Sequence, residues 1–402
     1  MTKLSEKDML LQKQPLLEPD NVEIPTSAKA TTRLAKLLVR GKGKTYDPSI
    51  TIPKTSEERL QAAAHDHALD ISVLFHDHGP KSKHSPQAPT SLPGAGVDKP
   101  EETVLYLAYG SNMSIQSFRK SRGILPISQL NVYVPGLSLT FDLPGFPYLE
   151  PCMAGTKYRD PNKTSSSLEK QDSVLTSDQT WNKPLVGVVY EVTLCDYARI
   201  IATEGGGASY IDIVTDCYPF PTSYDPADPV PAHPDKDSKP FKAHTLLSPS
   251  SKNGLNNSSL KNADAAANGN ATTNTRTSLF SSGPFACIHP PNAPAQPSPR
   301  YKNLLVTGAH EKDLPTEYRA YLSSITAYEI TSTRQRIGRY VTVALWAPPL
   351  IFIVILSSLL TDKDGRTPGW LAAGQRALIV GLWWWYDHFA KQAFGDGERT
   401  VE

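Results

Sequence analysis

Residues 106–113 read YLAYGSNM, and this stretch decides the fold. Its first half belongs to an apolar run, 104–109 (VLYLAY), with the length and composition of a buried strand. The strand should end at Gly110, because Gly110, Ser111 and Asn112 are small or polar residues that let consecutive backbone N–H groups face a concavity. Such a turn can bind a carboxylate or an oxyanion, although most turns of this composition only reverse the chain.

Further apolar patterns lie on both sides of a long polar gap. Residues 137–141 (LSLTF), 185–192 (LVGVVYEV) and 210–215 (YIDIVT) are expected strands, and 301–307 (YKNLLVT) should resume the sheet after the gap. One helix should begin after Thr193 as its N-cap and stop at Gly205, and another should open at Pro315. This order of elements favours a mixed sheet or barrel with flanking helices over alternating βαβ units.

Much of the remaining chain is too polar to bury a core, and it holds many of the 35 prolines. We expect residues 1–100 to be disordered, with at most a short helix near 56–69 that has nothing obvious to pack on. Residues 224–300 should form a disordered insertion in one folded domain, 101–223 plus 301–332, and residues 392–402 should form a tail.

The net charge of +1 gives no electrostatic case for nucleic-acid binding. The four cysteines (Cys152, Cys195, Cys217 and Cys287) lack metal-site or disulfide spacing, so free thiols in a reducing compartment are expected.

Residues 341–360, from Val341 to Leu360, contain no charged side chain. As a helix they would extend roughly 30 Å, the thickness of a bilayer's hydrocarbon core. The pair Pro348 and Pro349 would break a buried core helix, whereas a kinked membrane helix tolerates it. We therefore expect a transmembrane helix here.

The flanks of this segment predict its orientation. Arg334, Arg336 and Arg339 precede it and the N-terminus has no signal peptide, so a single-pass membrane protein with its folded domain facing the cytosol is expected. Residues 369–391 include three consecutive tryptophans suited to the headgroup region, which favours an interfacial amphipathic helix over a second span.

Glu204 closes the expected helix and is followed by three glycines. The helix macrodipole disfavours an anion at this end, and the glycines leave space for a ligand. Taken alone, Glu204 is better explained as a solvated residue at a helix end.

These features together resemble the γ-glutamylcyclotransferase family. YLAYGSNM resembles the family's substrate loop, and residues 187–205 (GVVYEVTLCDYARIIATEG) are similar to its strand, helix and catalytic Glu-Gly pair. Residues 301–325 (YKNLLVTGAHEKDLPTEYRAYLSSI) resemble its closing strand and helix. The resemblance covers about 100–222 and 300–330. The triple glycine, the long insert and the membrane segment depart from the family pattern.

The resemblance implies an α+β fold, a mixed-sheet β-barrel with flanking helices, and an enzyme that releases 5-oxoproline from a small γ-glutamyl substrate. Glu204 would be the general acid and base, and the substrate-binding residues would be Tyr109, Gly110, Ser111, Asn112, Met113, Tyr210 and Tyr301. Tyr210 and Tyr301 could equally be core residues, and a tyrosine at the position of Tyr109 is more often part of a strand core than a ligand-binding residue. No metal or organic cofactor is implied. The leaving group, which could be an amino acid, glutathione or another conjugate, and the oligomeric state are not specified.

Two other classes of function compete with the enzyme. One is a non-catalytic, membrane-anchored binding or scaffold protein that keeps the same fold, and the other is a membrane interaction protein that works through its tails. Glu204 beside an intact YGSN turn favours the enzyme.

Overall fold

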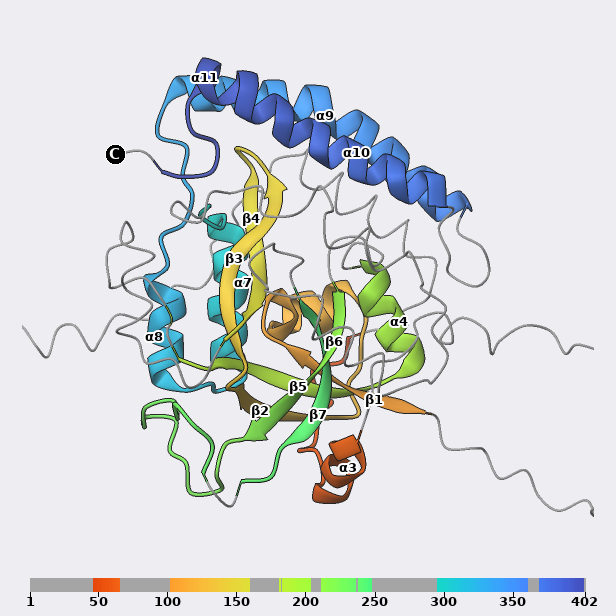
Figure 1. Ribbon diagram of the computed structural model, residues 1–402, viewed down its shortest axis with the longest axis vertical. Helices are drawn as coiled ribbons and strands as arrows, with labels where there is room; N and C mark the ends of the chain where they lie inside the picture. Colours follow the sequence, from red (N-terminus) through yellow and green to blue (C-terminus); the bar gives the residue numbers. More distant parts are fainter. Residues whose placement is uncertain are drawn as a thin grey trace, which may run out of the picture. The chain divides into compact units, whose positions relative to one another are not determined.

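Five strands close into a barrel in the described part of the chain, in the order β1-β5-β2-β6-β7 (Figure 1). The computed structural model describes residues 46–65, 102–159, 181, 183–203, 211–235, 238–247, 295–360 and 369–400, all within the compact unit Gly43–Glu402. The barrel strands are β1 (Thr103–Ala108), β2 (Ser128–Val134), β5 (Leu185–Thr193), β6 (Ile211–Pro219) and β7 (Phe241–Leu247).

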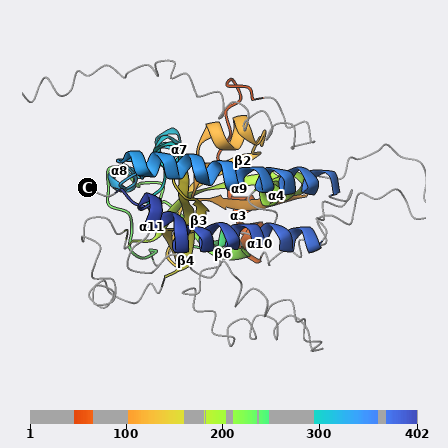
Figure 2. The same ribbon diagram turned by 90° about the horizontal axis from the view of Figure 1, so that it is seen from above.

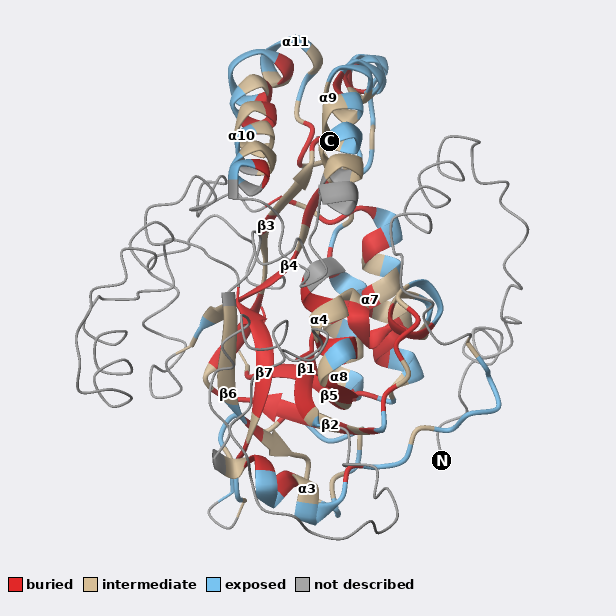
Figure 3. Cartoon of the chain, turned by 90° about the vertical axis from the view of Figure 1, so that its right-hand side faces the viewer, coloured by how far each residue is buried: buried red, intermediate tan, exposed pale blue. Residues whose placement is uncertain are grey.

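Neighbouring barrel strands are antiparallel except for β1 and β7, which run parallel and complete the ring. A hydrogen bond between a side chain and the backbone reinforces this junction: the Thr245 hydroxyl donates to the Leu107 carbonyl at 3.0 Å. Almost every residue of β1 and β5 is buried, as expected for apolar runs that form a core (Figure 3). Three helices flank the barrel: α4 (Leu194–Thr203), α7 (Pro299–Glu311) and α8 (Thr316–Ser324). Helix α4 contacts β1 and β5, and α7 contacts α8.

Two hairpins extend beyond the barrel. One consists of β3 (Leu137–Phe146) and β4 (Glu150–Tyr158). The other consists of α9 (Thr333–Leu360) and α10 (Gly369–Trp385), which lie side by side and continue into η7 (Tyr386–Ala390) and α11 (Lys391–Phe394) (Figure 2).

Tyr148 joins these two hairpins. It occupies the turn between β3 and β4 with a φ of 63°, and its hydroxyl lies 3.0 Å from the carbonyl oxygen of Ala390 and 2.8 Å from that of Gly395. Its ring packs edge-on against Tyr386. A Cβ added to Gly397 would lie 2.8 Å from the same ring, so the chain can pass there only as glycine.

Several sequence predictions are confirmed. The expected strands at 104–109, 137–141, 185–192 and 210–215 correspond to β1, β3, β5 and β6. Thr193 caps α4, since its hydroxyl accepts the Asp196 N–H at 3.1 Å. The helix expected at Pro315 is α8, with Tyr318 and Leu322 buried. The mixed barrel with flanking helices is therefore the fold of the protein.

Other predictions were wrong. Residues 301–307 belong to α7 and not to a strand, because Ser298 caps a helix with Pro299 in its first turn. Strand β7 lies inside 224–300, the stretch expected to be a disordered insertion, and residues 248–294 lie outside the described residues. Within the expected tail, Glu398 is buried and its carbonyl accepts the Gln296 N–H.

The N-terminal region expected to be disordered also contributes structure, at residues 46–65. Helix α3 (Glu57–Ala62) and the turn η1 (Ala63–His65) pack on the barrel. Arg59 donates from Nε to Glu191 at 3.0 Å and from a guanidinium nitrogen to the Thr103 carbonyl. Glu191 also accepts the hydroxyls of Thr103 and Ser128, so a partly buried carboxylate provides the partner for α3.

The expected transmembrane helix, 341–360, is not supported. Among the residues that the structure describes, no helix has both the length and the apolar character required to cross a bilayer. The segment forms most of α9, whose first turns carry arginines, and part of its apolar surface packs on α10. There a Cβ added to Gly381 would lie 3.1 Å from Trp346, and one added to Gly374 would lie 3.3 Å from Ile353.

We predict that Tyr148→Ala lowers the free energy of unfolding by about 3–5 kcal/mol, the usual cost of deleting a buried aromatic ring. The adjacent Leu149→Ala removes a side chain that is 52% exposed and should change stability by no more than about 0.5 kcal/mol. Denaturant unfolding of the full chain and both variants measures the difference. Equal stabilities for the two variants would show that Tyr148 does not anchor the helical hairpin.

Candidate functional site

The YGSN turn, Tyr109–Asn112, directly follows the last residue of strand β1. Ala108 is the last residue of β1, and Ser111–Met113 form a single 3₁₀ turn, η3. Two backbone bonds close this turn, from the Met113 N–H to the Gly110 carbonyl and from the Ser114 N–H to the Ser111 carbonyl. Asn112 is buried and donates from Nδ2 to the Tyr106 hydroxyl at 2.9 Å, so the turn is fixed to the strand that precedes it.

A small pocket of about 20 Å³ lies against this turn. Five of the seven expected substrate-binding residues line it, together with Tyr106, Ala154 and Leu246; these five are Tyr109, Gly110, Ser111, Asn112 and Tyr301. Met113 is fully buried and is not among the lining residues. Glu204 and Tyr210 lie outside the described residues.

Tyr301 reaches the pocket from helix α7. The Ser298 hydroxyl accepts the Tyr301 N–H at 3.1 Å, which fixes the start of the helix. The Tyr301 hydroxyl accepts the Ala154 N–H at 3.1 Å. The same hydroxyl would lie 3.3 Å from a Cβ added to Gly110. A glycine at 110 therefore leaves room for the tyrosine beside the turn.

Helix α7 also contacts the turn directly at Gly308. A Cβ added there would lie 2.7 Å from the Ser114 backbone nitrogen and 2.9 Å from the Met113 carbonyl carbon. These are backbone atoms that cannot rotate away. The glycine lets the helix backbone approach the turn, and any larger residue would have to displace one of them.

A buried polar cluster lies behind Tyr106. The Tyr197 hydroxyl donates to Asp212 at 2.7 Å, and Nδ1 of His244 lies 3.4 Å from both oxygens of the same carboxylate. Burial, followed by the charge of Asp212, raises the pKa of Tyr197 far above its ordinary value. The cluster joins α4, β6 and β7, and the Tyr197 ring lies 6.0 Å from that of Tyr106.

Sequence reasoning missed this cluster. Tyr197 matched the apolar face of a helix, and His244 lay in the expected insertion. Neither residue therefore indicated a buried polar cluster. The aspartate at 212 within an otherwise apolar strand, YIDIVT, was the one available indication that the strand buries a polar partner.

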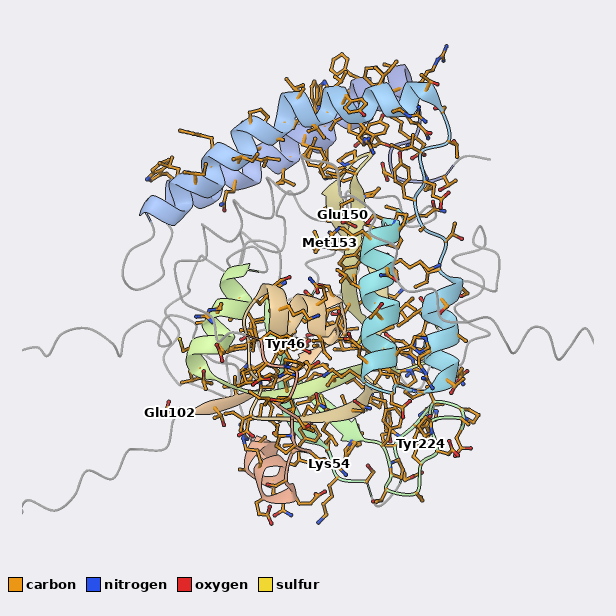
Figure 4. The ribbon with its side chains drawn as sticks, turned by 180° about the vertical axis from the view of Figure 1, so that it is seen from behind. Tyr46, Lys54, Glu102, Glu150, Met153 and Tyr224 are labelled. Carbon is orange, nitrogen blue, oxygen red and sulfur yellow. The ribbon has the colours of Figure 1, made fainter. Side chains whose placement is uncertain are left out.

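A second hollow, of about 300 Å³, lies between the β3–β4 hairpin and α10. Leu143, Phe146, Glu150, Met153 and Ile379 are among the residues that line it. Figure 4 labels Glu150 and Met153 on the β3–β4 hairpin. The Glu150 carboxylate accepts hydrogen bonds from the Ser298 hydroxyl and from Arg300. The walls of the hollow are mainly apolar, and the carboxylate of Glu150 is already paired with Ser298 and Arg300. In the described part of the chain, no group of three His, Cys, Asp or Glu residues could hold a metal ion.

Comparison with known proteins identifies relatives that are named gamma-glutamyl cyclotransferases. Residues 332–391 match the family model described as the AclK C-terminal domain. The chain is 29% identical over 309 residues to gamma-glutamyl cyclotransferase gliK of Aspergillus fumigatus, covering 76% of this chain and 92% of the relative. It is 32% identical over 147 residues to gamma-glutamyl cyclotransferase verK of Clonostachys rogersoniana, covering 37% of this chain and 74% of the relative. A solved structure titled gamma-glutamyl cyclotransferase aligns at 15% identity with a TM-score of 0.33, covering 59% of this chain and 97% of the other.

We predict that Gly308→Ala destabilises the protein by about 1–3 kcal/mol, the usual cost of overpacking. Alanine is the better helix former by about 1 kcal/mol, so intrinsic propensity alone would give the opposite sign. Gly136→Ala is the matched control, because a Cβ there meets nothing within 4 Å. Thermal unfolding compares the variants. A more stable Gly308→Ala protein would contradict the close contact between α7 and the turn.

A pH-dependent prediction follows from Lys312, which ends α7 and donates to Gln129 at 2.8 Å. Burial lowers its pKa to about 8 from an ordinary 10.5. Between these values the unfolded chain binds a proton that the folded chain does not, so this group makes the free energy of unfolding rise with pH. Below the folded-state pKa both states carry the proton and the slope vanishes.

Lys312→Met removes this titration. The free energy of unfolding of the wild type minus that of the variant should therefore increase from about pH 7 to about pH 10. Denaturant unfolding at several pH values measures it, with Lys302→Met on the same helix as the control for losing a lysine. A difference for Lys312→Met that stays constant with pH would refute the lowered pKa.

Proposed function

The chain belongs to the γ-glutamyl cyclotransferase family, and on that premise we propose that it converts a γ-glutamyl compound into 5-oxoproline and a free amine. In this reaction the α-amine of the glutamyl group attacks the carbonyl carbon of its own side-chain amide. A five-membered ring forms, the amide C–N bond breaks, and the leaving nitrogen gains the proton that the amine loses. Because the nucleophile is part of the substrate, the protein must mainly hold a folded substrate and move a proton.

The observation that carries this proposal is the shared pocket. The YGSN turn and Tyr301 are almost two hundred positions apart in the sequence, yet they line one cavity. The turn contributes small polar residues, and α7 contributes Tyr301. In the proposal, backbone N–H groups of the turn and the Asn112 side chain hold the glutamyl moiety and stabilise the oxyanion that develops at the amide carbonyl.

Glu204 is the proposed general acid and base. A single carboxylate whose pKa lies near neutrality can take the proton from the attacking amine and return it to the leaving nitrogen. Glu204 directly follows α4 in the sequence. The hydrogen bond from Tyr197 to Asp212 ties α4 to β6 and would thereby fix the point from which the segment with Glu204 departs.

Substrate entry would require the pocket to widen. A volume of about 20 Å³ has room for roughly one water molecule. Two side-chain hydrogen bonds hold its walls, one between Tyr301 and Ala154 and one from the Tyr109 hydroxyl to the Leu246 carbonyl. We propose that rotation of one of these tyrosines admits the glutamyl group.

Glu204→Gln tests the assignment. General acid–base groups contribute about 10²–10⁴-fold, so the variant should lose at least about 99% of turnover while still binding substrate. Glu329→Gln, which changes an exposed glutamate that does not line the pocket, should keep its activity. The assay measures 5-oxoproline from the full chain with γ-glutamyl dipeptides and glutathione.

Two outcomes would overturn parts of the proposal. A Glu204→Gln variant that keeps more than roughly a tenth of the wild-type rate would remove Glu204 from the mechanism. A wild-type chain that forms no 5-oxoproline from any of these substrates would favour the non-catalytic scaffold that shares the fold.

A further inference from the structure

The helical hairpin formed by α9, α10 and η7 exposes an unusual number of large apolar side chains. Seven such side chains are more than half exposed among the described residues, and all but Leu149 lie on this hairpin. These six are Tyr340, Leu345 and Phe352 on α9, and Trp370, Trp384 and Phe389 on α10 and η7. We call them the outer hairpin face. Scattered exposed hydrophobic residues are normal on protein surfaces, but a cluster of this size marks a binding surface.

Helical spacing shows that this exposure is organised. Leu345 and Phe352 are seven residues apart on α9, and Trp370 and Trp384 are fourteen apart on α10. Residues at these spacings lie along one side of a helix. Each helix therefore has a continuous apolar side that faces solvent.

The other sides of the two helices are already packed. Trp346 of α9 lies against Gly381 of α10. Trp383 and Tyr386 are buried with Tyr148 in a small core of their own. The hairpin thus has its internal partners, and the outer hairpin face is not needed to hold it in place.

The charge on the hairpin indicates what the face meets. Neither α9 nor α10 contains an aspartate or glutamate anywhere in its sequence. Arg334 and Arg336 are exposed in the first turns of α9. The acidic residue Asp387 is exposed in η7, between Trp384 and Phe389. An apolar, aromatic side on two helices that lack acidic residues, with arginines at the start of α9, complements a bilayer that contains anionic lipids, with tryptophan and tyrosine rings at the headgroup boundary.

A second copy of the chain would fit this surface less well. A two-fold contact through the outer hairpin face would bring the same patch of each copy together, and neither α9 nor α10 of the second copy would supply an acidic residue to pair with Arg334 and Arg336. Charged groups that lose water without gaining a partner oppose association. The charge pattern therefore favours lipid over self-association.

We propose that the outer hairpin face docks on the surface of an anionic lipid bilayer, with the axes of α9 and α10 in the plane of the membrane. The apolar side chains enter the boundary between headgroups and acyl chains, and Arg334 and Arg336 contact lipid phosphates. This proposal does not depend on the cyclotransferase reaction.

Co-sedimentation of the full chain with vesicles tests the proposal. The chain should sediment with vesicles of phosphatidylcholine and phosphatidylserine, and less with phosphatidylcholine alone. The double substitution Phe352→Ser and Trp384→Ser should weaken binding at least about tenfold, given the apolar area that two large side chains bury. Ile127→Ser is the control, because Ile127 is an exposed apolar residue next to β2. Arg334→Gln with Arg336→Gln should abolish most of the preference for phosphatidylserine.

Thermal unfolding of each variant first establishes that it is folded, since the substituted side chains are exposed. Three results would overturn the proposal: absence of binding to either vesicle, equal binding by the wild type and the Phe352→Ser, Trp384→Ser variant, or a dimer in analytical ultracentrifugation that forms through this face without vesicle binding. Binding that high salt does not weaken would exclude the contribution of the arginines.

Discussion

The parallel pairing of β1 with β7 is the constraint on which the rest of the structure depends. It closes the barrel by joining residues 103–108 to residues 241–247. Through this junction Leu246 reaches the pocket, where its carbonyl accepts the Tyr109 hydroxyl. The same strand brings His244 to Asp212 and Tyr197. Without β7 the end of β1 would be a free edge, and the YGSN turn would have support on one side only.

Local signals in the sequence predicted the elements that depend on local physics. The apolar run before Gly110 became a buried strand, and Thr193 capped the helix that follows β5, because strand burial and N-capping are decided by a few neighbouring residues. The pocket-lining role of the turn and of Tyr301 was anticipated through the family resemblance. Composition or spacing alone would not have brought those segments together.

The remaining features depend on distant partners. FKAHTLL forms β7 because β6 and β1 stand on either side of it, although its surroundings are rich in proline and serine. Helix α3 contacts the barrel through residues that are distant in the sequence, since its Arg59 donates to Glu191. YKNLLVT has the composition of a strand, yet Ser298 and Pro299 start a helix there. The need for glycine at 308 arises only from the close contact between α7 and the YGSN turn. Tertiary contacts of this kind leave little trace in a local pattern.

The helical hairpin leaves the body of the protein and returns to the place where it left. The Glu329 N–H donates to the Thr400 hydroxyl, and Thr400 in turn donates to the Ala327 carbonyl and, from its backbone, to Gln296. A segment whose two ends meet in this way can be gained, lost or exchanged during evolution without altering the path of the chain on either side. The barrel and the hairpin can thus diverge at different rates, with the hairpin as a module that is attached to the rest of the fold at one place.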